Sequence, residues 1–316
     1  MQSNGGNLIK HLRKKMGVTQ EELANKLFMS QRALSNIENG TTGLSIMDFY
    51  AAFQALGLPT EDFWIVHLTT QEFEGYLQYK KMRYCLCSGN VTALSDMYQS
   101  IINNPLAQRP FLSQFLSYVS VIIDNNMPGD QKLQTLFAAL GRSIDAFEEP
   151  GQYRLNYNEV LIINEIALIY ARLGQQKRAA VSLSTGHEEH TCPERDKAIA
   201  LLSSIVQNMG NLRTTTEEDS MLFPKPHVDL STLLMESGRF EEAAKICETT
   251  LELIKKYRYM RQLGSYASYQ LGECYYKMKK SKKEYTPLFT MAYHTARAFG
   301  QNSLANQIKE EYTISS

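Results

Sequence analysis

Three side chains that can read DNA bases lie close together in the segment SQRALSNIENG, residues 30–40. Gln31 and Asn36 have amides that can bond N6 and N7 of adenine at two points, and the guanidinium of Arg32 can bond O6 and N7 of guanine in the same way. On a helix, these side chains fall opposite Leu34 and an isoleucine three residues further on. An ordinary solvated helix face shows a similar split but usually carries Lys and Glu. We therefore predict a base-reading surface of Gln31, Arg32 and Asn36, with Ser35 beside them.

Other chemistries find little support in the sequence. The segment HEEHTC contains three potential zinc ligands, His187, His190 and Cys192. The metalloprotease helix motif needs histidines at positions i and i+4, and residue 191 is Thr, so a polar loop before Pro193 is the favoured interpretation. The chain also has no glycine-rich loop of the kind that holds phosphates. We therefore expect no enzyme activity, no cofactor and no metal.

The reading surface needs neighbouring helices to position it. Ser30 can cap the first turn of its helix, and Asn39-Gly40 supplies a left-handed stop at the end. Another helix begins at Thr19, which forms a capping box with Glu22, and only two residues separate its end from Ser30. Two helices joined by so short a turn form a helix-turn-helix. Further helices are predicted at residues 45–58, which Gly57 and Pro59 end, and from an apolar stripe of Leu8, Ile9, Leu12 and Met16.

Charge gives partial support for DNA binding. The chain has 33 basic and 33 acidic residues, so its net charge does not indicate nucleic acid. Between Met1 and Arg32, however, six residues are basic and two are acidic, a modest excess that suits phosphate contacts. A second basic run, residues 277–283, is interpreted as a solvated turn between helices, with a contact to DNA or to a partner as the alternative.

The expected cellular compartment depends on whether the sequence contains a membrane-spanning segment or a signal peptide. It has no run of 18 apolar residues, and its first residues lack the apolar core of a signal peptide, so we expect a cytoplasmic protein. The five cysteines include no C-x-x-C pair and are expected to be reduced thiols, with Cys85 and Cys87 in a helix core.

The remaining residues, 70–316, have helical periodicity throughout, so the whole chain is predicted to be all-α. Three segments, residues 164–180, 228–246 and 268–285, each suggest a helix, a turn and a second helix; the turn contains Gly in the first two and Lys in the third. Helix pairs that cannot bury their apolar faces alone indicate a tetratricopeptide-like (TPR-like) α-solenoid. Weaker helical patterns at residues 92–102, 109–123 and 130–144 would complete the stack.

The N-terminal pattern, G-x-T-Q-x-x-L-A followed by S-Q-R-x-L-S-x-I-E-N-G, resembles the lambda-repressor-like (Xre) class of helix-turn-helix domains over residues 5–66. The resemblance implies that Gln31, Arg32 and Asn36 read bases. It also implies a structural pair that ties the first helix to the reading helix, Arg13 with Glu38. Phe28 departs from the class, which often has Gly in the turn. The full set of DNA-binding residues implied is Gln20, Ser30, Gln31, Arg32, Ser35, Asn36 and Asn39, with Gln20 and Asn39 on phosphates.

An Xre domain followed by a TPR-like array resembles the PlcR-like members of the RRNPP family of peptide-pheromone receptors. The segments NEIALIYARLG, SGRFEEA, SYQLGECYYK and DFWIV carry this likeness. It implies a helix-turn-helix domain at residues 1–66 and a linker helix with a TPR-like domain at residues 67–316. It also implies a homodimer that binds operator DNA and a short signalling peptide.

The same resemblance implies five peptide-binding residues. Asn164 and Gln270 match groove positions, and Asp229 stands where the family has Asn, which points to a basic peptide residue. Asn164 could instead bond a neighbouring helix. Trp64 could sense the peptide or pack the domain joint, and Lys81, like Lys80, could pair a peptide carboxylate or face solvent.

Two functions fit these observations. The first is a quorum-sensing transcription regulator that binds palindromic operator DNA and is switched by a peptide in the TPR-like groove. The second is a TPR adaptor that binds a folded protein partner, without peptide control of DNA binding. An adaptor has no need of Gln31, Arg32 and Asn36 together.

Overall fold

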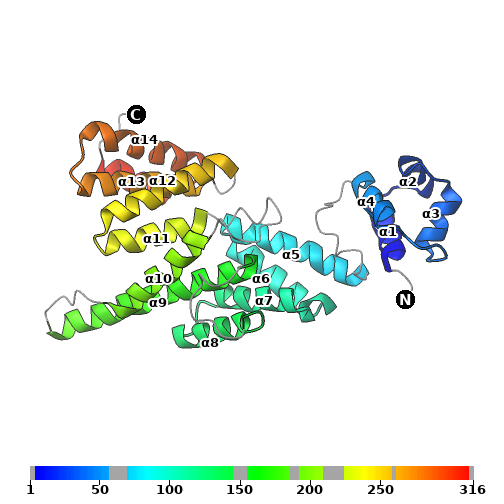
Figure 1. Ribbon diagram of the computed structural model, residues 1–316, viewed down its shortest axis with the longest axis horizontal. Helices are drawn as coiled ribbons and strands as arrows, with labels where there is room; N and C mark the ends of the chain where they lie inside the picture. Colours follow the sequence, from blue (N-terminus) through cyan, green and yellow to red (C-terminus); the bar gives the residue numbers. More distant parts are fainter. Residues whose placement is uncertain are drawn as a thin grey trace. The chain divides into compact units, whose positions relative to one another are not determined.

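A computed structural model of the chain describes residues 4–56, 70–144, 155–185, 192–208, 224–257 and 261–312. These residues form helices and no strand, as the all-α prediction requires (Figure 1). The chain divides into two compact units, residues 1–116 and residues 117–316. The predicted domain boundary at residues 66 and 67 falls outside the described residues.

The first unit begins with four short helices and continues with a helix pair in which α5 is the longer member. Its helices are α1 (Asn4–Lys15), α2 (Gln20–Lys26), α3 (Gln31–Glu38), α4 (Ile46–Ala55), α5 (Thr70–Ser88), α6 (Val91–Ile101), the 3₁₀ turn η2 (Pro105–Gln108) and the start of α7 (Pro110–Ile123).

Helices α1–α4 form the predicted helix-turn-helix module. The Thr19–Glu22 capping box starts α2, and the Ser30 hydroxyl accepts a hydrogen bond from the Ala33 N–H at 3.1 Å to start α3. Gly6 lets α1 approach α3 closely, because a Cβ at this position would lie 2.0 Å from the Ile37 carbonyl oxygen. The predicted stripe residue Met16 is exposed. The buried apolar side chains of the module are Leu8, Ile9, Leu12, Leu23, Ala24, Leu34, Ile37, Phe49, Ala52, Phe53 and Leu56.

Helix α5 packs against α1 in the same unit. Glu74 on α5 accepts hydrogen bonds from Lys15 Nζ at 2.7 Å and from His11 Nε2 at 3.1 Å. A chain of aromatic contacts continues the core from α4 along α5 to α7, through Phe49, Phe53, Phe73, Tyr76, Tyr79 and Phe115.

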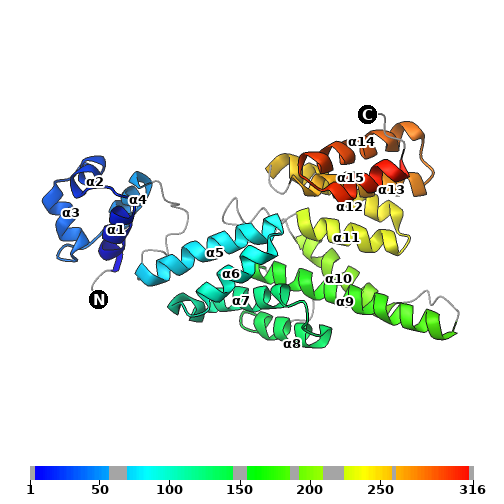
Figure 2. The ribbon, with the colours of Figure 1, turned by 180° about the vertical axis from the view of Figure 1, so that it is seen from behind.

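The second unit consists of consecutive helix pairs. Figures 1 and 2 show α11, α12, α13 and α14 as successive layers in which each helix runs back along its neighbour. The first helices of the pairs also contact one another, α9 with α11 and α11 with α13. The helices after α7 are α8 (Gly129–Leu140), α9 (Tyr157–Thr185), α10 (Pro193–Asn208), α11 (Pro224–Glu236), α12 (Phe240–Tyr257), α13 (Leu263–Lys277), α14 (Lys282–Ala298) and α15 (Asn302–Glu311).

Two of the three predicted repeat turns are present. Gly238, between α11 and α12, has a φ of +73°, and Lys279, between α13 and α14, has a φ of +57°. Both residues therefore adopt the left-handed conformation that ends a helix, and in the second turn a lysine does so in place of glycine. These pairs confirm the TPR-like prediction for this part of the chain, and the basic run at residues 277–283 is the turn between helices that the charge pattern indicates.

The third predicted turn, at Gly174, is wrong. Helix α9 runs without interruption from Tyr157 to Thr185. Gly174 serves packing instead, because a Cβ there would lie 2.5 Å from Cys192 Sγ, next to the first residue of α10. A glycine selected for close approach looks, in the sequence, like a glycine selected for a turn.

Other predictions concern features outside the helix pairs. His187 and His190 lie outside the described residues, and no group of three potential metal ligands occurs among those that are described. Cys85, Cys192, Cys247 and Cys274 are buried free thiols. In the described ranges, every helix is too short or too polar to cross a membrane.

Candidate functional sites

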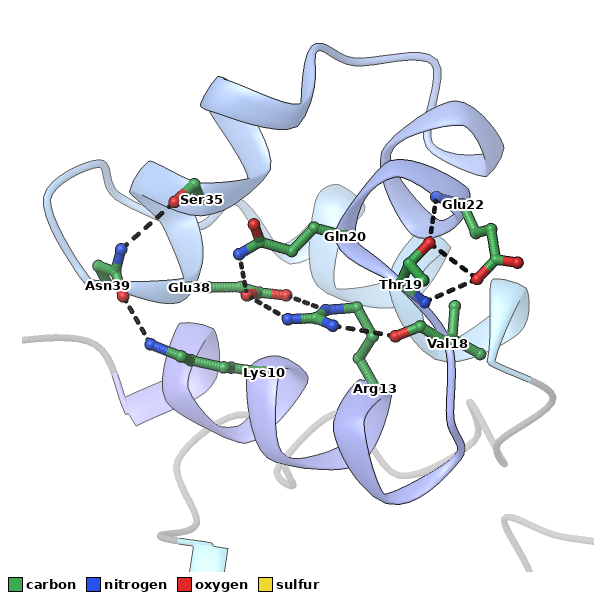
Figure 3. Close-up of polar contacts among 9 residues, drawn as sticks. All are labelled: Lys10, Arg13, Val18, Thr19, Gln20, Glu22, Ser35, Glu38 and Asn39. Atoms are coloured by element: carbon green, nitrogen blue, oxygen red, sulfur yellow. Dashed lines mark hydrogen bonds and ion pairs between the residues drawn. The ribbon is translucent and has the colours of Figure 1, made fainter.

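A buried ion pair holds α3 against α1. Arg13 Nε donates to Glu38 Oε1 at 2.6 Å, and its Nη2 donates to Glu38 Oε2 at 2.9 Å (Figure 3). Arg13 Nη1 also donates to the Val18 carbonyl at 2.9 Å, just before α2. The guanidinium therefore connects the end of α1, the start of α2 and the end of α3, which fixes the orientation of the reading helix.

Gln20 belongs to the same cluster. Its amide nitrogen donates to Glu38 Oε2 at 2.7 Å, so one side of this predicted phosphate contact is occupied within the domain. Burial would raise the pKa of Glu38, but the hydrogen bonds from Arg13 and Gln20 outweigh it and the pKa is lowered. Glu38 is consequently ionised at neutral pH and holds all three donors.

The opposite side of α3 is exposed. Gln31, Arg32 and Asn36 are exposed, and Ser35 is half-buried beside them. Within residues 4–56, none of the first three has a side-chain hydrogen bond or ion pair. Their polar groups are thus available to an external partner, whereas Leu34 and Ile37 on the other side are buried.

Asn39 and Lys10 form a second polar cluster at the end of α3. Lys10 Nζ donates to Asn39 Oδ1 at 2.7 Å, and Asn39 Nδ2 donates to Ser35 Oγ at 3.4 Å. The close-up in Figure 3 shows this chain of contacts running from α1 to α3. The Xre pattern indicates Asn39 but not Lys10 as a DNA-binding residue. The only sequence signal for Lys10 was its membership of the basic N-terminal segment, because 29 residues separate it from Asn39.

Phe28 lies in the turn between α2 and α3. Its φ is +55° and its side chain is 99% exposed. The left-handed conformation explains why glycine suits this position. The turn forms with Phe in this conformation, so the departure from the Xre pattern adds backbone strain there.

A group of buried polar side chains lies on the first helices of the repeat pairs, α9, α11 and α13. Asn164 on α9 is buried, and its amide nitrogen donates to Asp229 Oδ2 on α11 at 2.9 Å. Lys225 Nζ donates to the same oxygen at 3.0 Å. The alternative in which Asn164 bonds a neighbouring helix therefore describes one half of its amide.

The oxygen of the Asn164 amide, in contrast to the nitrogen, makes no such contact within the described ranges. Asn164 Oδ1 is buried and has no hydrogen-bond partner among the described residues. An unpaired buried acceptor of this kind destabilises a protein by about 1–3 kcal/mol. This oxygen could accept a backbone N–H from a ligand.

Gln270 on α13 is held by α11. Its Oε1 accepts from Ser231 Oγ at 2.8 Å, and its Nε2 donates to Thr232 Oγ1 at 2.6 Å. The structure thus joins Asn164 and Asp229 by a direct hydrogen bond. Gln270 lies on α13, the first helix of the following pair. Lys225, Ser231 and Thr232 are partners that sequence analysis missed, because single polar residues on a helix carry no signal of what they contact.

The remaining predicted peptide contacts lie in the first unit or outside the described residues. Trp64 lies outside them. Lys81 is exposed on α5, in the first unit, and Lys80 lies 5.7 Å from the ring centroid of Tyr76.

Comparison with known proteins identifies the first module. Residues 9–63 match the HTH_3 helix-turn-helix family. A separate comparison with curated proteins finds no match.

Solved structures match nearly the whole chain. PlcR from Bacillus thuringiensis, bound to the peptide PapR7 and DNA, is 19% identical with a TM-score of 0.68, over 97% of this chain and 99% of that one. The chain therefore has the fold of PlcR. ComR from S. thermophilus, bound to DNA and its signalling peptide ComS, is 14% identical with a TM-score of 0.56, over 97% and 98% of the two chains. PlcR in its apo form is 18% identical with a TM-score of 0.59, over 96% and 98%.

This shared fold confirms the predicted architecture, an N-terminal helix-turn-helix followed by a TPR-like helical domain. The prediction that the chain is not an enzyme agrees with matches to a helix-turn-helix family and to proteins solved with DNA and signalling peptides.

Proposed function

We propose that the chain is a quorum-sensing transcription regulator. Residues 1–66 bind operator DNA through α3, and residues 67–316 form the homodimer and bind a short signalling peptide along α9, α11 and α13. The observation that carries the DNA-binding proposal is the arrangement of α3. Its exposed side presents Gln31, Arg32 and Asn36 without partners in residues 4–56, while its other side is held by a buried ion pair.

In this proposal the remaining polar groups of the module hold the DNA backbone. Ser30 and Asn39 lie at the two ends of α3, and each keeps donor capacity after its contact within the domain. Gln20 keeps its amide oxygen and one N–H, and Lys10 adds a positive charge beside Asn39. A homodimer would place two such helices in major grooves about 34 Å, or a multiple of this, apart, on a pseudo-palindromic site.

To test the DNA proposal, bound duplexes are selected from a random pool. The affinity of the protein for the most enriched duplex is then measured by fluorescence anisotropy at fixed salt. Arg32→Ala should weaken binding by about 1–3 kcal/mol and relax selection at one position of each half-site. Arg297→Ala is the matched control, because this arginine is also exposed but lies on α14. Equal affinity of the full-length protein for selected and scrambled DNA would refute the proposal and favour the adaptor function.

For the peptide, the supporting observation is the free oxygen of Asn164 inside a polar group. A peptide N–H would satisfy it, so peptide binding removes a penalty that the free protein carries. Because Asp229 already accepts from Asn164 and Lys225, we assign it the role of orienting Asn164. Its preference for a basic peptide residue is then weaker than the sequence alone indicates.

Calorimetry with synthetic peptides encoded next to the gene tests this site. Asn164→Ala should weaken the binding of the active peptide roughly tenfold or more, since about 1.4 kcal/mol corresponds to a factor of ten. Gln175→Ala is the matched control, because its amide also joins α9 to α11, through Glu236 at 3.1 Å, but is exposed. Equal losses in both variants would show that the α9–α11 contact matters and the Asn164 oxygen does not.

A further inference from the structure

A pocket of about 290 Å³ lies among α13, α14 and α15, and neither candidate site uses it. Ligand pockets commonly measure about 300–1,000 Å³, so this one has room for a single side chain or a small organic molecule. Its walls are mostly aromatic. The lining residues are Tyr276, Tyr285, Phe289 and Tyr312, with Lys282, Thr286 and Glu311.

The four rings form a closed circuit of contacts. Tyr276 meets Tyr285 edge to face at 5.6 Å between ring centroids, with an interplanar angle of 89°. Tyr285 meets Phe289 at 6.1 Å, and Phe289 stacks on Tyr312 at 3.6 Å. The circuit closes where Tyr312 meets Tyr276 at 6.2 Å and 76°. Aromatic faces carry negative electrostatic potential, and rings that surround a cavity from several sides attract cations.

Two carboxylates reinforce this potential. Glu311 lines the pocket, where its two oxygens accept from Tyr269 Oη at 2.9 Å and from Gln307 Nε2 at 3.1 Å. Glu273 accepts from the hydroxyl of Tyr312, one of the four rings. Within the described residues, neither carboxylate forms an ion pair.

The two carboxylates also lie close enough to affect each other. Burial raises the pKa of Glu273, Lys277 partly opposes this, and the charge of Glu311 raises it further. A cation in the pocket would relieve this repulsion. Lys282 is the single cation among the lining residues that the structure describes, and it is exposed, so solvent screens its charge.

We propose that this pocket binds an organic cation, an alkylammonium or guanidinium group held between the aromatic walls with Glu311 as its counter-charge. The group could belong to a basic side chain of a peptide or to a small quaternary ammonium compound. Both carry one positive charge and differ in their N–H donors, so the experiment must separate them.

The test titrates the full-length protein with two cations and their neutral counterparts. Choline is compared with 3,3-dimethylbutanol, and N-acetylarginine amide with N-acetylcitrulline amide, by calorimetry and by proton NMR of the ligand. A cation seated among the rings should bind roughly tenfold tighter than its neutral counterpart and show upfield-shifted protons. Binding of the arginine compound alone assigns the pocket to a basic side chain, and binding of choline alone assigns it to a quaternary ammonium compound.

Variants locate the site. Tyr285→Leu should weaken cation binding roughly tenfold, and Glu311→Gln, which preserves shape, should weaken it severalfold. Tyr266→Leu is the matched control, because Tyr266 is an exposed tyrosine on α13 outside the pocket. The proposal is overturned if the neutral compounds bind as tightly as the cations, if no cation binds at millimolar concentration, or if Glu311→Gln has no effect.

Discussion

Substitution of Glu38 by Gln tests how the reading helix is held. Glu38 is fully buried and receives three hydrogen bonds, two from Arg13 at 2.6 and 2.9 Å and one from Gln20 at 2.7 Å. Glu38→Gln keeps the shape of the side chain but removes its charge, so the buried guanidinium of Arg13 loses its counter-ion. The contact between α1 and α3 should weaken, and with it the orientation of the reading surface.

The expected size follows from the burial of the pair. Removing one partner of a buried ion pair typically destabilises a protein by about 3–5 kcal/mol. The substituted amide can still accept one hydrogen bond through its oxygen, so we expect the lower end, about 3 kcal/mol. This corresponds to roughly a 150-fold increase in the opening of the domain.

Hydrogen exchange followed by mass spectrometry measures this opening separately for α1 and α3 in the full-length chain. Glu242→Gln is the matched control, because the Arg239–Glu242 pair has the same two-point geometry at 2.7 Å but half-exposed side chains. We expect at most a twofold change there. If Glu38→Gln speeds exchange in α3 by no more than Glu242→Gln speeds exchange in its own helix, the ion pair does not hold the reading helix.

Three further predictions concern the first unit. Phe28→Gly should stabilise the helix-turn-helix by about 1 kcal/mol, because it relieves a left-handed φ and loses no burial; slower exchange in α2 and α3 would show this. Gly6→Ala should destabilise it by about 2 kcal/mol, because the new Cβ would meet the Ile37 carbonyl, and faster exchange in α1 is the measurement. Burial would raise the pKa of Glu74, but hydrogen bonds from Lys15 and His11 lower it. The α1–α5 contact should therefore hold above the ordinary carboxyl pKa of 4.5 and weaken as the pH falls below it, which exchange in α5 at pH 6 and about pH 3.5 would detect.

Local signals made the helix-turn-helix predictable. Capping by Thr19 and Ser30 depends on residues three positions apart, so a single sequence contains the whole pattern. The turn at Gly238 follows from the same kind of local rule. Helix existence and type are therefore accessible wherever the cause lies within one or two turns.

Contacts between distant residues were not predictable in this way. Gly174 is small because of Cys192, and Gln20 is occupied because Glu38 is buried beside it. The sequence shows these residue types without showing their partners. The link between Asn164 and Asp229, 65 residues apart, is of the same kind. Its unpaired oxygen becomes visible only when the surrounding helices are placed.

The most direct test of the proposed function is the effect of the peptide on DNA affinity. The dissociation constant for the selected operator is measured at fixed salt, without peptide and with the peptide identified by calorimetry at saturation, for the natural chain and for Asn164→Ala. A peptide-switched regulator predicts a change of about 5–150-fold in the natural chain and a much smaller one in the variant at the same peptide concentration. An operator affinity that is the same with and without bound peptide would contradict the account.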